Sequence, residues 1–322
     1  MAEQLTLWQT AAPAGEPQPG ENAVRAPGEP QGVAIGTCAW ADHAPFYPPK
    51  LKPAERLVYY SRFFSLVEVD STYYAMQPAA RFAAWTKATP PGFQFNVKAY
   101  RALTRHDREP KPGEEDLGLV ARQFTEALEP MRAEGKLTAV HLQFPPWFVQ
   151  NRDNEAYLAW IREAFPRDLV AVEFRHRSWW AAERREETLG LLRVLEAVNV
   201  VVDEPQVGSG SIPLVPEVTH PALAVFRFHG RNKDTWYIKA KNSGERFHYR
   251  YSREELASFV PTVERARSEA RQIHLLLNNN YENYAVVNAI EFKQLFGQPV
   301  ETPEVLGPAL GDATSVTEPG RD

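Results

Sequence analysis

Ionisable side chains recur along one short apolar segment of the sequence. The segment 225–231 reads Val-Phe-Arg-Phe-His-Gly-Arg, and its period of two places Arg227, His229 and Arg231 on one face, opposite the two phenylalanines. Charges on a buried strand face must be paired with opposite charges or must bind an anion. This segment is therefore predicted to bring two guanidinium groups and one imidazole to a site.

Two carboxylates at the ends of other predicted strands are candidates for acid–base chemistry. Glu173 lies in the alternating segment Val-Ala-Val-Glu-Phe-Arg, and Asp203 ends the apolar run that begins at residue 198. Neighbouring Arg175 and Arg227 are expected to keep at least one of the two carboxylates ionised, and His229 suits proton transfer. We therefore predict Glu173, Asp203 and His229 as catalytic residues.

Lysine and arginine side chains on the same faces suit the binding of a phosphate or carboxylate group, because a guanidinium binds such groups with two parallel hydrogen bonds. Aromatic rings near the ends of the strands suit stacking against a sugar or a base. The loop 104–106, Thr-Arg-His, is a second candidate for anion contact, with a solvated loop as the alternative. The predicted substrate-binding residues are Lys98, Arg175, Arg227, Arg231, Asp70, Tyr73, Gln143, Asn278, Asn279 and Trp40.

The predicted catalytic residues also suit a divalent metal ion, because carboxylates and imidazole are common metal ligands. Two observations weigh against a metal at Glu173, Asp203 and His229. The last predicted strand ends in Asn278 and Asn279 rather than in a carboxylate, and the adjacent arginines would repel a cation. We therefore expect that no cofactor is required, and we keep a divalent metal at these three residues as the alternative.

The elements that must position these residues alternate between strand and helix patterns. Eight segments have strand patterns and seven of them are followed by helical patterns, one of which runs from 116 to 134; the exception is the Pro- and Gly-containing stretch 205–221. This order predicts a parallel sheet in an α/β protein, closed as a single-domain (β/α)8 TIM-type barrel over residues 32–297. A doubly wound open sheet is the alternative, although no glycine-rich fingerprint follows the first strand.

Polar residues are expected to line the interior of this barrel and to gather at the C-terminal ends of the strands, where barrel enzymes have their active sites. A buried network of paired charges that serves only the fold is the alternative.

The composition restricts the class of protein. The chain has 322 residues and a formal net charge of -5, so its overall charge does not favour binding to nucleic acid, although a local basic patch would. Cys38 is the only cysteine, which excludes a disulfide within the chain and suits a reducing compartment. No apolar run is long enough to cross a membrane, and no signal peptide is evident. We expect a cytoplasmic protein without a membrane partner.

Both ends of the chain have compositions typical of disorder. Residues 1–31 and 298–322 are rich in proline, glycine and polar residues. Within the first tail, Gln4, Leu5, Leu7 and Trp8 belong to the pentapeptide Gln-Leu-Thr-Leu-Trp. It resembles the Gln-Leu-x-Leu-Phe type of peptide by which bacterial repair and replication proteins bind the DNA sliding clamp. The alternative is a disordered tail with a few apolar residues.

Seven blocks of the sequence, in order, resemble one known family. The first, Ile-Gly-Thr-Cys-Ala-Trp from Ile35, is similar to the family's Gly-Thr-Ser-Gly-Trp, with Cys38 and Ala39 departing from it; glycine is also commoner at the position of Asn283. The family is the YecE-like proteins, domain of unknown function 72. The resemblance implies a TIM-type barrel and no particular activity. The other blocks begin at Val67, Phe93, Leu142, Val172, Arg227 and Asn278.

These features together predict an enzyme, of the hydrolase, lyase or isomerase class, that acts on a small anionic and phosphate-bearing substrate. One alternative is an endonuclease-like accessory protein that processes nucleic acid and is tethered to the sliding clamp. The other is a barrel that binds a ligand without catalysis, in which case a tight ligand would co-purify unchanged.

The tethering hypothesis predicts that a peptide of residues 1–12 binds a purified bacterial sliding clamp. Because Leu7 and Trp8 would fill the apolar pocket of the clamp, replacing both with alanine should abolish binding. Fluorescence anisotropy of the labelled peptide measures both affinities. Equal binding of the two peptides, or binding of neither, would reject the tether.

Overall fold

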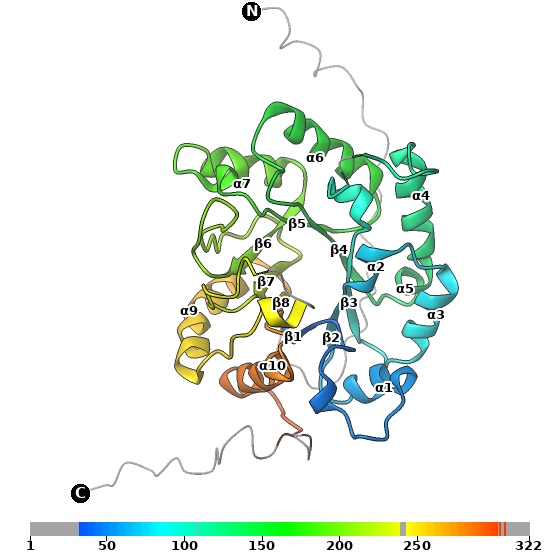
Figure 1. The fold of residues 1–322 in the computed structure, drawn as a ribbon, viewed down its shortest axis with the longest axis vertical. Coiled ribbons are helices and arrows are strands. Elements are labelled where there is room, and N and C mark those ends of the chain that lie inside the picture. The colour runs from blue at the N-terminus through cyan, green and yellow to red at the C-terminus, as the bar shows by residue number, and fades with distance from the viewer. Residues whose placement is uncertain (1–31, 108, 239–242, 302, 304–305, 307–322) are drawn as a thin grey trace, which may run out of the picture.

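The computed structural model describes residues 32–301 except 108 and 239–242, together with residues 303 and 306. Eight parallel strands follow one another in sequence order and close into a barrel, and helices surround it (Figure 1). The predicted (β/α)8 barrel is confirmed, and the open doubly wound sheet is wrong because the first and eighth strands pair. The N-terminal pentapeptide lies outside the described residues.

The strands are short, as expected for a barrel of this kind, and the stretch 205–221 contains no helix, as predicted. None of the described helices is both long and apolar enough to cross a bilayer. The strands are β1 (Val33–Cys38), β2 (Leu66–Val69), β3 (Gln94–Lys98), β4 (Leu137–Gln143), β5 (Val170–Glu173), β6 (Ala197–Asp203), β7 (Ala224–Phe228) and β8 (Ile273–Leu277). The α-helices are α1 (Arg56–Tyr60), α2 (Ser71–Tyr74), α3 (Ala79–Lys87), α4 (Leu117–Ala127), α5 (Glu129–Ala133), α6 (Arg152–Ala164), α7 (Arg185–Val194), α8 (Ser243–Arg246), α9 (Arg253–Glu269) and α10 (Tyr284–Leu295).

The single helix predicted over residues 116–134 is wrong, because the structure divides it into α4 and α5. Pro130 lies in the first turn of α5, and proline cannot continue a preceding helix because it lacks the backbone N–H.

The helix α9 begins with a capping box formed by Ser252 and Glu255. Ser252 accepts a hydrogen bond from the backbone N–H of Glu255, whose carboxylate accepts one from the backbone N–H of Ser252.

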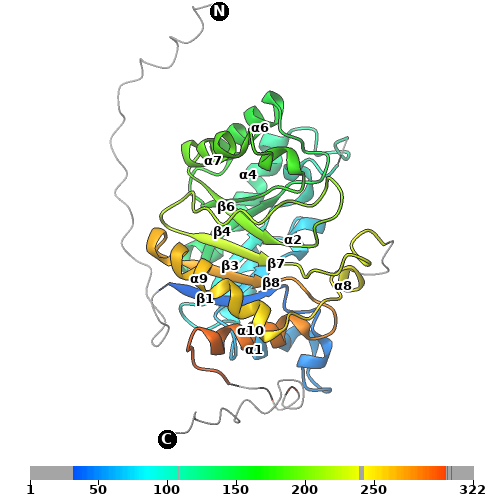
Figure 2. The same ribbon diagram turned by 90° about the vertical axis from the view of Figure 1, so that its left-hand side faces the viewer.

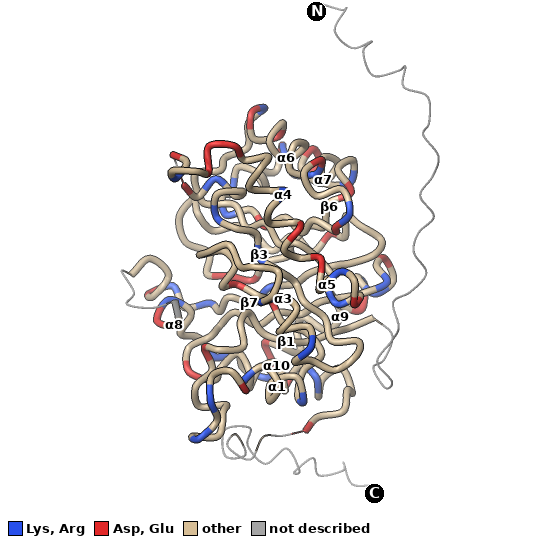
Figure 3. The backbone as a smooth tube through the Cα atoms, turned by 90° about the vertical axis from the view of Figure 1, so that its right-hand side faces the viewer, with Lys and Arg blue, Asp and Glu red and all other residues tan. Residues whose placement is uncertain are grey.

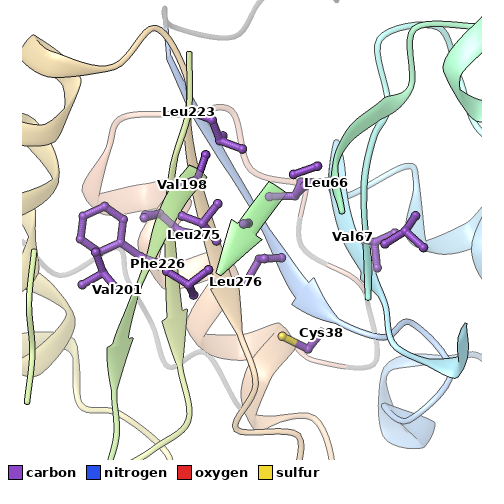
Figure 4. Packing of buried hydrophobic residues seen from close by; sticks show 14 of the residues in the cluster. Cys38, Leu66, Val67, Val198, Val201, Leu223, Phe226, Leu275 and Leu276 are labelled. Atoms are coloured by element: carbon purple, nitrogen blue, oxygen red, sulfur yellow. The ribbon is translucent and has the colours of Figure 1, made fainter. Parts of the chain in front are cut away.

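Apolar side chains fill the space between the strands and the helices. The ring centroid of Phe228 lies 5.0 Å from that of Phe259 in α9 and 5.0 Å from that of Phe292 in α10. On the inner face, Leu66 and Leu276 lie in register on either side of Gly36 and are fully buried (Figure 4). Burial of these side chains provides the main driving force for closing the barrel.

A layer of polar side chains also crosses the interior of the barrel. His274 of β8 lies with Nδ1 3.1 Å from Asn96 Oδ1 and with Nε2 2.9 Å from Gln94 Oε1. Burial lowers the pKa of His274 to about 3, so the ring is neutral at pH 7. The barrel therefore uses hydrogen bonds as well as apolar contacts to join strands that are not neighbours.

Charged residues on the outside include both signs. In Figure 3, blue and red segments are interspersed along the helices that surround the barrel. The helix α8 projects from one end of the barrel, within the long segment between β7 and α9 (Figure 2).

Candidate functional site

Arg227 lies in the centre of the barrel with 2% of its surface exposed. Its Nη2 donates to Glu68 Oε1 at 2.7 Å, and its Nη1 donates to Glu173 Oε2 at 2.5 Å. His141 spans the same carboxylates, with Nδ1 3.0 Å from Glu68 Oε2 and Nε2 3.2 Å from Glu173 Oε2. The four side chains come from β2, β4, β5 and β7, and they form a closed ring in which each carboxylate lies between Arg227 and His141.

Both carboxylates in this ring are ionised. Burial alone would raise the pKa of Glu68, but Arg227 and His141 hold it far below its usual range. Burial likewise opposes ionisation of Glu173, and Arg175 and Arg227 overcome it, so the pKa of Glu173 is also strongly lowered. Glu173 therefore holds no proton near neutral pH, and its interactions suit it to fix the arginines in place.

Arg175 extends the network toward the C-terminal end of the barrel. Its Nε lies 2.5 Å from Glu173 Oε1, its Nη1 donates to Glu204 Oε2 at 2.5 Å, and its Nη2 lies 3.0 Å from His229 Nε2. Burial and Arg175 lower the pKa of His229 to about 3, so the imidazole is neutral at pH 7. Asn278 contacts the other ring nitrogen, with Nδ2 2.7 Å from His229 Nδ1.

Glu204 is a member of the interior network that the sequence did not reveal. Its Oε1 accepts a hydrogen bond from the backbone N–H of Ile212 at 2.8 Å, which ties the loop after β6 to Arg175. Burial raises the pKa of Glu204 to about 7, and Arg175 acts in the opposite direction. The run of apolar residues that precedes it does not alternate with polar ones, so its pattern does not indicate which of the two adjacent carboxylates faces inward.

Asp203 lies on the opposite face of β6 from the interior network. It pairs in register with Phe228, whose ring packs on the outer helices. The carboxylate accepts from Tyr251 Oη at 2.6 Å and from Arg231 Nε at 2.9 Å. Arg231 leaves the face of Arg227 because Gly230 takes a φ of +89°, a left-handed conformation suited to glycine. The structure thus places Asp203 and Arg231 in a separate cluster, which Glu255 completes.

The three residues considered for a metal are consequently not brought together. His229 Nε2 lies 3.6 Å from Glu173 Oε1, whereas Asp203 binds Arg231 and Tyr251. Within residues 32–301, apart from the gaps at 108 and 239–242, no group of three or more His, Cys, Asp or Glu side chains is arranged to hold a metal ion.

Lys98 differs from the buried arginines. Its Nζ donates to Gln143 Oε1 at 3.1 Å and lies 4.8 Å from the ring centroid of Tyr73. No carboxylate of the described residues forms an ion pair with it, whereas Arg175 and Arg227 each pair with a carboxylate. Burial and the nearby Arg227 lower the pKa of Lys98. Lys98 is therefore a partly buried cation that no carboxylate of the described residues pairs with directly.

Asp70 flanks Lys98 at the mouth of the barrel. It lies one position beyond the register pair of Val69 and Val97, so that it adjoins Lys98 on the neighbouring strand. Burial and the charge of Asp42 raise the pKa of Asp70 to about 6. An amine with a lowered pKa beside a carboxyl group with a raised pKa suits proton exchange near neutral pH.

Two predicted substrate-binding residues have partners within the fold. Asn279 donates to the backbone carbonyl of Tyr249 at 2.9 Å and to Asn288 Oδ1 at 2.8 Å. The ring of Trp40 packs edge-on against that of Trp85, with centroids 5.3 Å apart. Asn279 and Trp40 therefore have structural roles. The other predicted binding residues Lys98, Asp70, Tyr73 and Gln143 lie together at the mouth of the barrel.

Comparison with known proteins agrees with this architecture. The family described as "Protein of unknown function DUF72" matches residues 34–310. The chain belongs to the DUF72 family. UPF0759 protein YunF of Bacillus subtilis (strain 168) is 37% identical over 266 residues, which cover 82% of this chain and 94% of YunF. The YecE-like resemblance read from the sequence blocks is thereby confirmed, since it names the same family.

Solved structures of DUF72 family proteins have the same fold. One from Enterococcus faecalis V583 is 29% identical, with a TM-score of 0.77, and the match covers 84% of this chain and 97% of that chain. Another from Thermotoga maritima MSB8 is 34% identical, with a TM-score of 0.72, and the match covers 83% of this chain and 100% of that chain. The family thus establishes the barrel, and the chemistry must be argued from the side chains.

The interior ring predicts a large loss of stability in Arg227→Met. This substitution leaves Glu68 and Glu173 without their common guanidinium, and breaking a buried ion pair in this way costs about 3–5 kcal/mol. The wild type should lose stability as the pH falls through and below the ordinary carboxyl range, since both folded-state pKa values are depressed. In the variant the two carboxylates accept protons more readily, so its deficit in the free energy of unfolding should be largest at pH 7 and smaller near pH 5.

Urea denaturation at both pH values measures this deficit. Arg62→Met is the control, because the Arg62–Glu301 pair is more than half exposed and such pairs contribute less than about 1 kcal/mol. A deficit in Arg227→Met no larger than in the control, or one that grows on acidification, would contradict the role of the ring.

Proposed function

We propose that this protein is an enzyme that acts on a small, phosphate-bearing substrate at the C-terminal mouth of the barrel. Lys98 binds the phosphate, and the adjacent Asp70 exchanges a proton with the substrate. The observation that supports this proposal is the state of Lys98, a partly buried, desolvated ammonium group without a carboxylate partner among the described residues.

The charge of Lys98 favours an anionic ligand. A buried ammonium group is costly unless an opposite charge or several hydrogen bonds compensate it, and Gln143 supplies one neutral acceptor. The guanidinium carbon of Arg101 lies 5.8 Å from the ring centroid of Tyr73, the ring that Lys98 also contacts, so a second cation is close by. A phosphate dianion that binds here would gain charge-assisted hydrogen bonds and relieve the desolvated charge.

The interior network supports this site from below. Gln143 Oε1, which accepts from Lys98, also lies 3.4 Å from Nη1 of Arg227. Glu173 in turn holds Arg227. We therefore assign Glu173, Arg175 and Arg227 to positioning, and Asp70 to the acid–base role that the sequence suggested for Glu173 and Asp203. His229 remains a neutral hydrogen-bonding group of the same network, in contact with Arg175.

Lys98→Met should weaken the binding of phosphate esters about tenfold or more, because a hydrogen bond to a charged group contributes about 1.5–3 kcal/mol. Lys87→Met, which changes an exposed lysine at the end of α3, is the matched control and should bind like the wild type. Calorimetric titration with phosphorylated compounds and their unphosphorylated counterparts measures the effect. Equal affinities for the two classes, or equal affinities of the two variants, would reject the proposal.

Asp70→Asn separates catalysis from binding at the same site. If Asp70 exchanges the proton, this variant should bind the ligand but fail to convert it, and wild-type turnover should change with an apparent pKa near 6. A ligand that binds in a Lys98-dependent manner and is never converted would favour the non-catalytic barrel.

A nucleic-acid substrate is the second proposal, and two features support it. The N-terminal pentapeptide resembles a sliding-clamp ligand, and the rings of Tyr74 and Tyr237, in or beside loops at the C-terminal ends of the strands, are 65% and 62% exposed. Exposed rings suit stacking against unpaired bases. Binding to single-stranded or abasic DNA that weakens with salt would favour this substrate over a small phosphate ester.

A further inference from the structure

The loop after β3 brings a histidine to the ring that Lys98 contacts. His106 follows the short 3-10 helix Arg101–Thr104, and its ring lies edge-on to Tyr73 with centroids 4.9 Å apart. Lys98 Nζ lies 4.8 Å from the centroid of the same Tyr73 ring. A lysine from the end of a strand and a histidine from the following loop thus flank one aromatic side chain at the mouth.

The ring of His106 is held in one orientation. Its Nδ1 lies 2.8 Å from Thr104 Oγ1, and its edge also meets Trp147 with centroids 6.0 Å apart. Because Thr104 occupies Nδ1, Nε2 is the ring nitrogen that remains for a ligand. His106 is only partly buried, so a ligand that enters the mouth can reach it.

The charges that face His106 are mostly positive. Lys98 comes from β3, Arg101 from the same loop and Arg175 from the segment after β5, while Asp107 is the opposing charge. Asp107 is itself paired with Arg101 at 2.6 Å. Burial and these cations lower the pKa of His106 to about 3, so the ring is neutral at pH 7 and lies where an anion would be attracted.

We propose that Lys98 and His106 form one phosphate-binding site beside Tyr73, and that binding of the dianion is coupled to protonation of His106. The inference rests on the proposed function and identifies a second residue that contacts the substrate. A dianion bound beside both side chains would offset the effect of burial and of the nearby cations, which together keep the imidazole neutral. The proton taken up by His106 then gives a second charge-assisted hydrogen bond, from Nε2 to the anion.

The test uses the full chain and inorganic sulfate, which stays a dianion across the pH range of the experiment. The ring signals of 13C-labelled histidine are followed by NMR between pH 4 and 8, and the signal of His106 is identified from its loss in His106→Gln. In the free protein His106 should titrate below this range, and saturating sulfate should raise its midpoint by about two units or more, into the range. The ring signal is the readout because protonation of Asp70, which lies near the site, also strengthens anion binding at low pH.

Affinity measurements complete the test. His106→Gln should weaken sulfate binding several-fold at pH 4, where the bound imidazole is protonated, whereas His248→Gln, which changes an exposed histidine stacked on Tyr281, should leave it unchanged. Sulfate binding that needs Lys98 but leaves the His106 signal and the His106→Gln affinity unaltered would overturn this inference and leave the proposed function in place. Sulfate and phosphate binding that is absent, or unaltered in Lys98→Met, would overturn both.

Discussion

Arg227 makes two buried ion pairs, with Glu68 and Glu173, and much of the polar interior depends on them. TIM barrels usually fill this space with branched apolar side chains, whereas here ionised groups from three strands, Glu68, Glu173 and Arg227, meet near the axis. Two carboxylates with strongly lowered pKa values could not remain ionised in such a place without the guanidinium between them. The network also holds the side chains next to it in place, since Gln143 contacts both Arg227 and Lys98.

The same network separates the polar residues by role. Arg175 and Arg227 are bound to carboxylates, and their charges are already matched. Lys98 lies one step further out, where Gln143 links it to Arg227 without neutralising it. Asp70 and His106 near Lys98 both have shifted pKa values, Asp70 raised and His106 lowered to about 3. Perturbed titration of groups clustered at the mouth of a barrel is typical of a functional site, whereas the saturated pairs below it are typical of a support.

Much of the fold could be predicted from the sequence because alternation of strand and helix patterns is strong and local. The inward positions of Arg227 and His229 followed from the phenylalanines between them, which must face the helices. Asp203 could not be placed in this way, since the valine run before it has no alternation, and Glu204 is the inward residue. Arg231 does not share the inward face of Arg227 and His229, as the alternation predicted, because the backbone turns at Gly230. Whether Lys98 has a carboxylate partner depends on which side chains lie near it in the folded barrel. The spacing of residues along the chain carries no such information.

The proposed function requires that Lys98, rather than the buried arginines, binds an anion. A crystal structure of the protein soaked in tungstate, a phosphate-like oxyanion whose anomalous signal locates it directly, tests the claim most simply. We expect a tungsten peak with an oxygen in hydrogen-bonding distance of Lys98 Nζ, and no such peak in crystals of Lys98→Met. A peak bound instead by Arg175 or Arg227, with their carboxylate partners displaced, or one that persists in Lys98→Met, would contradict it.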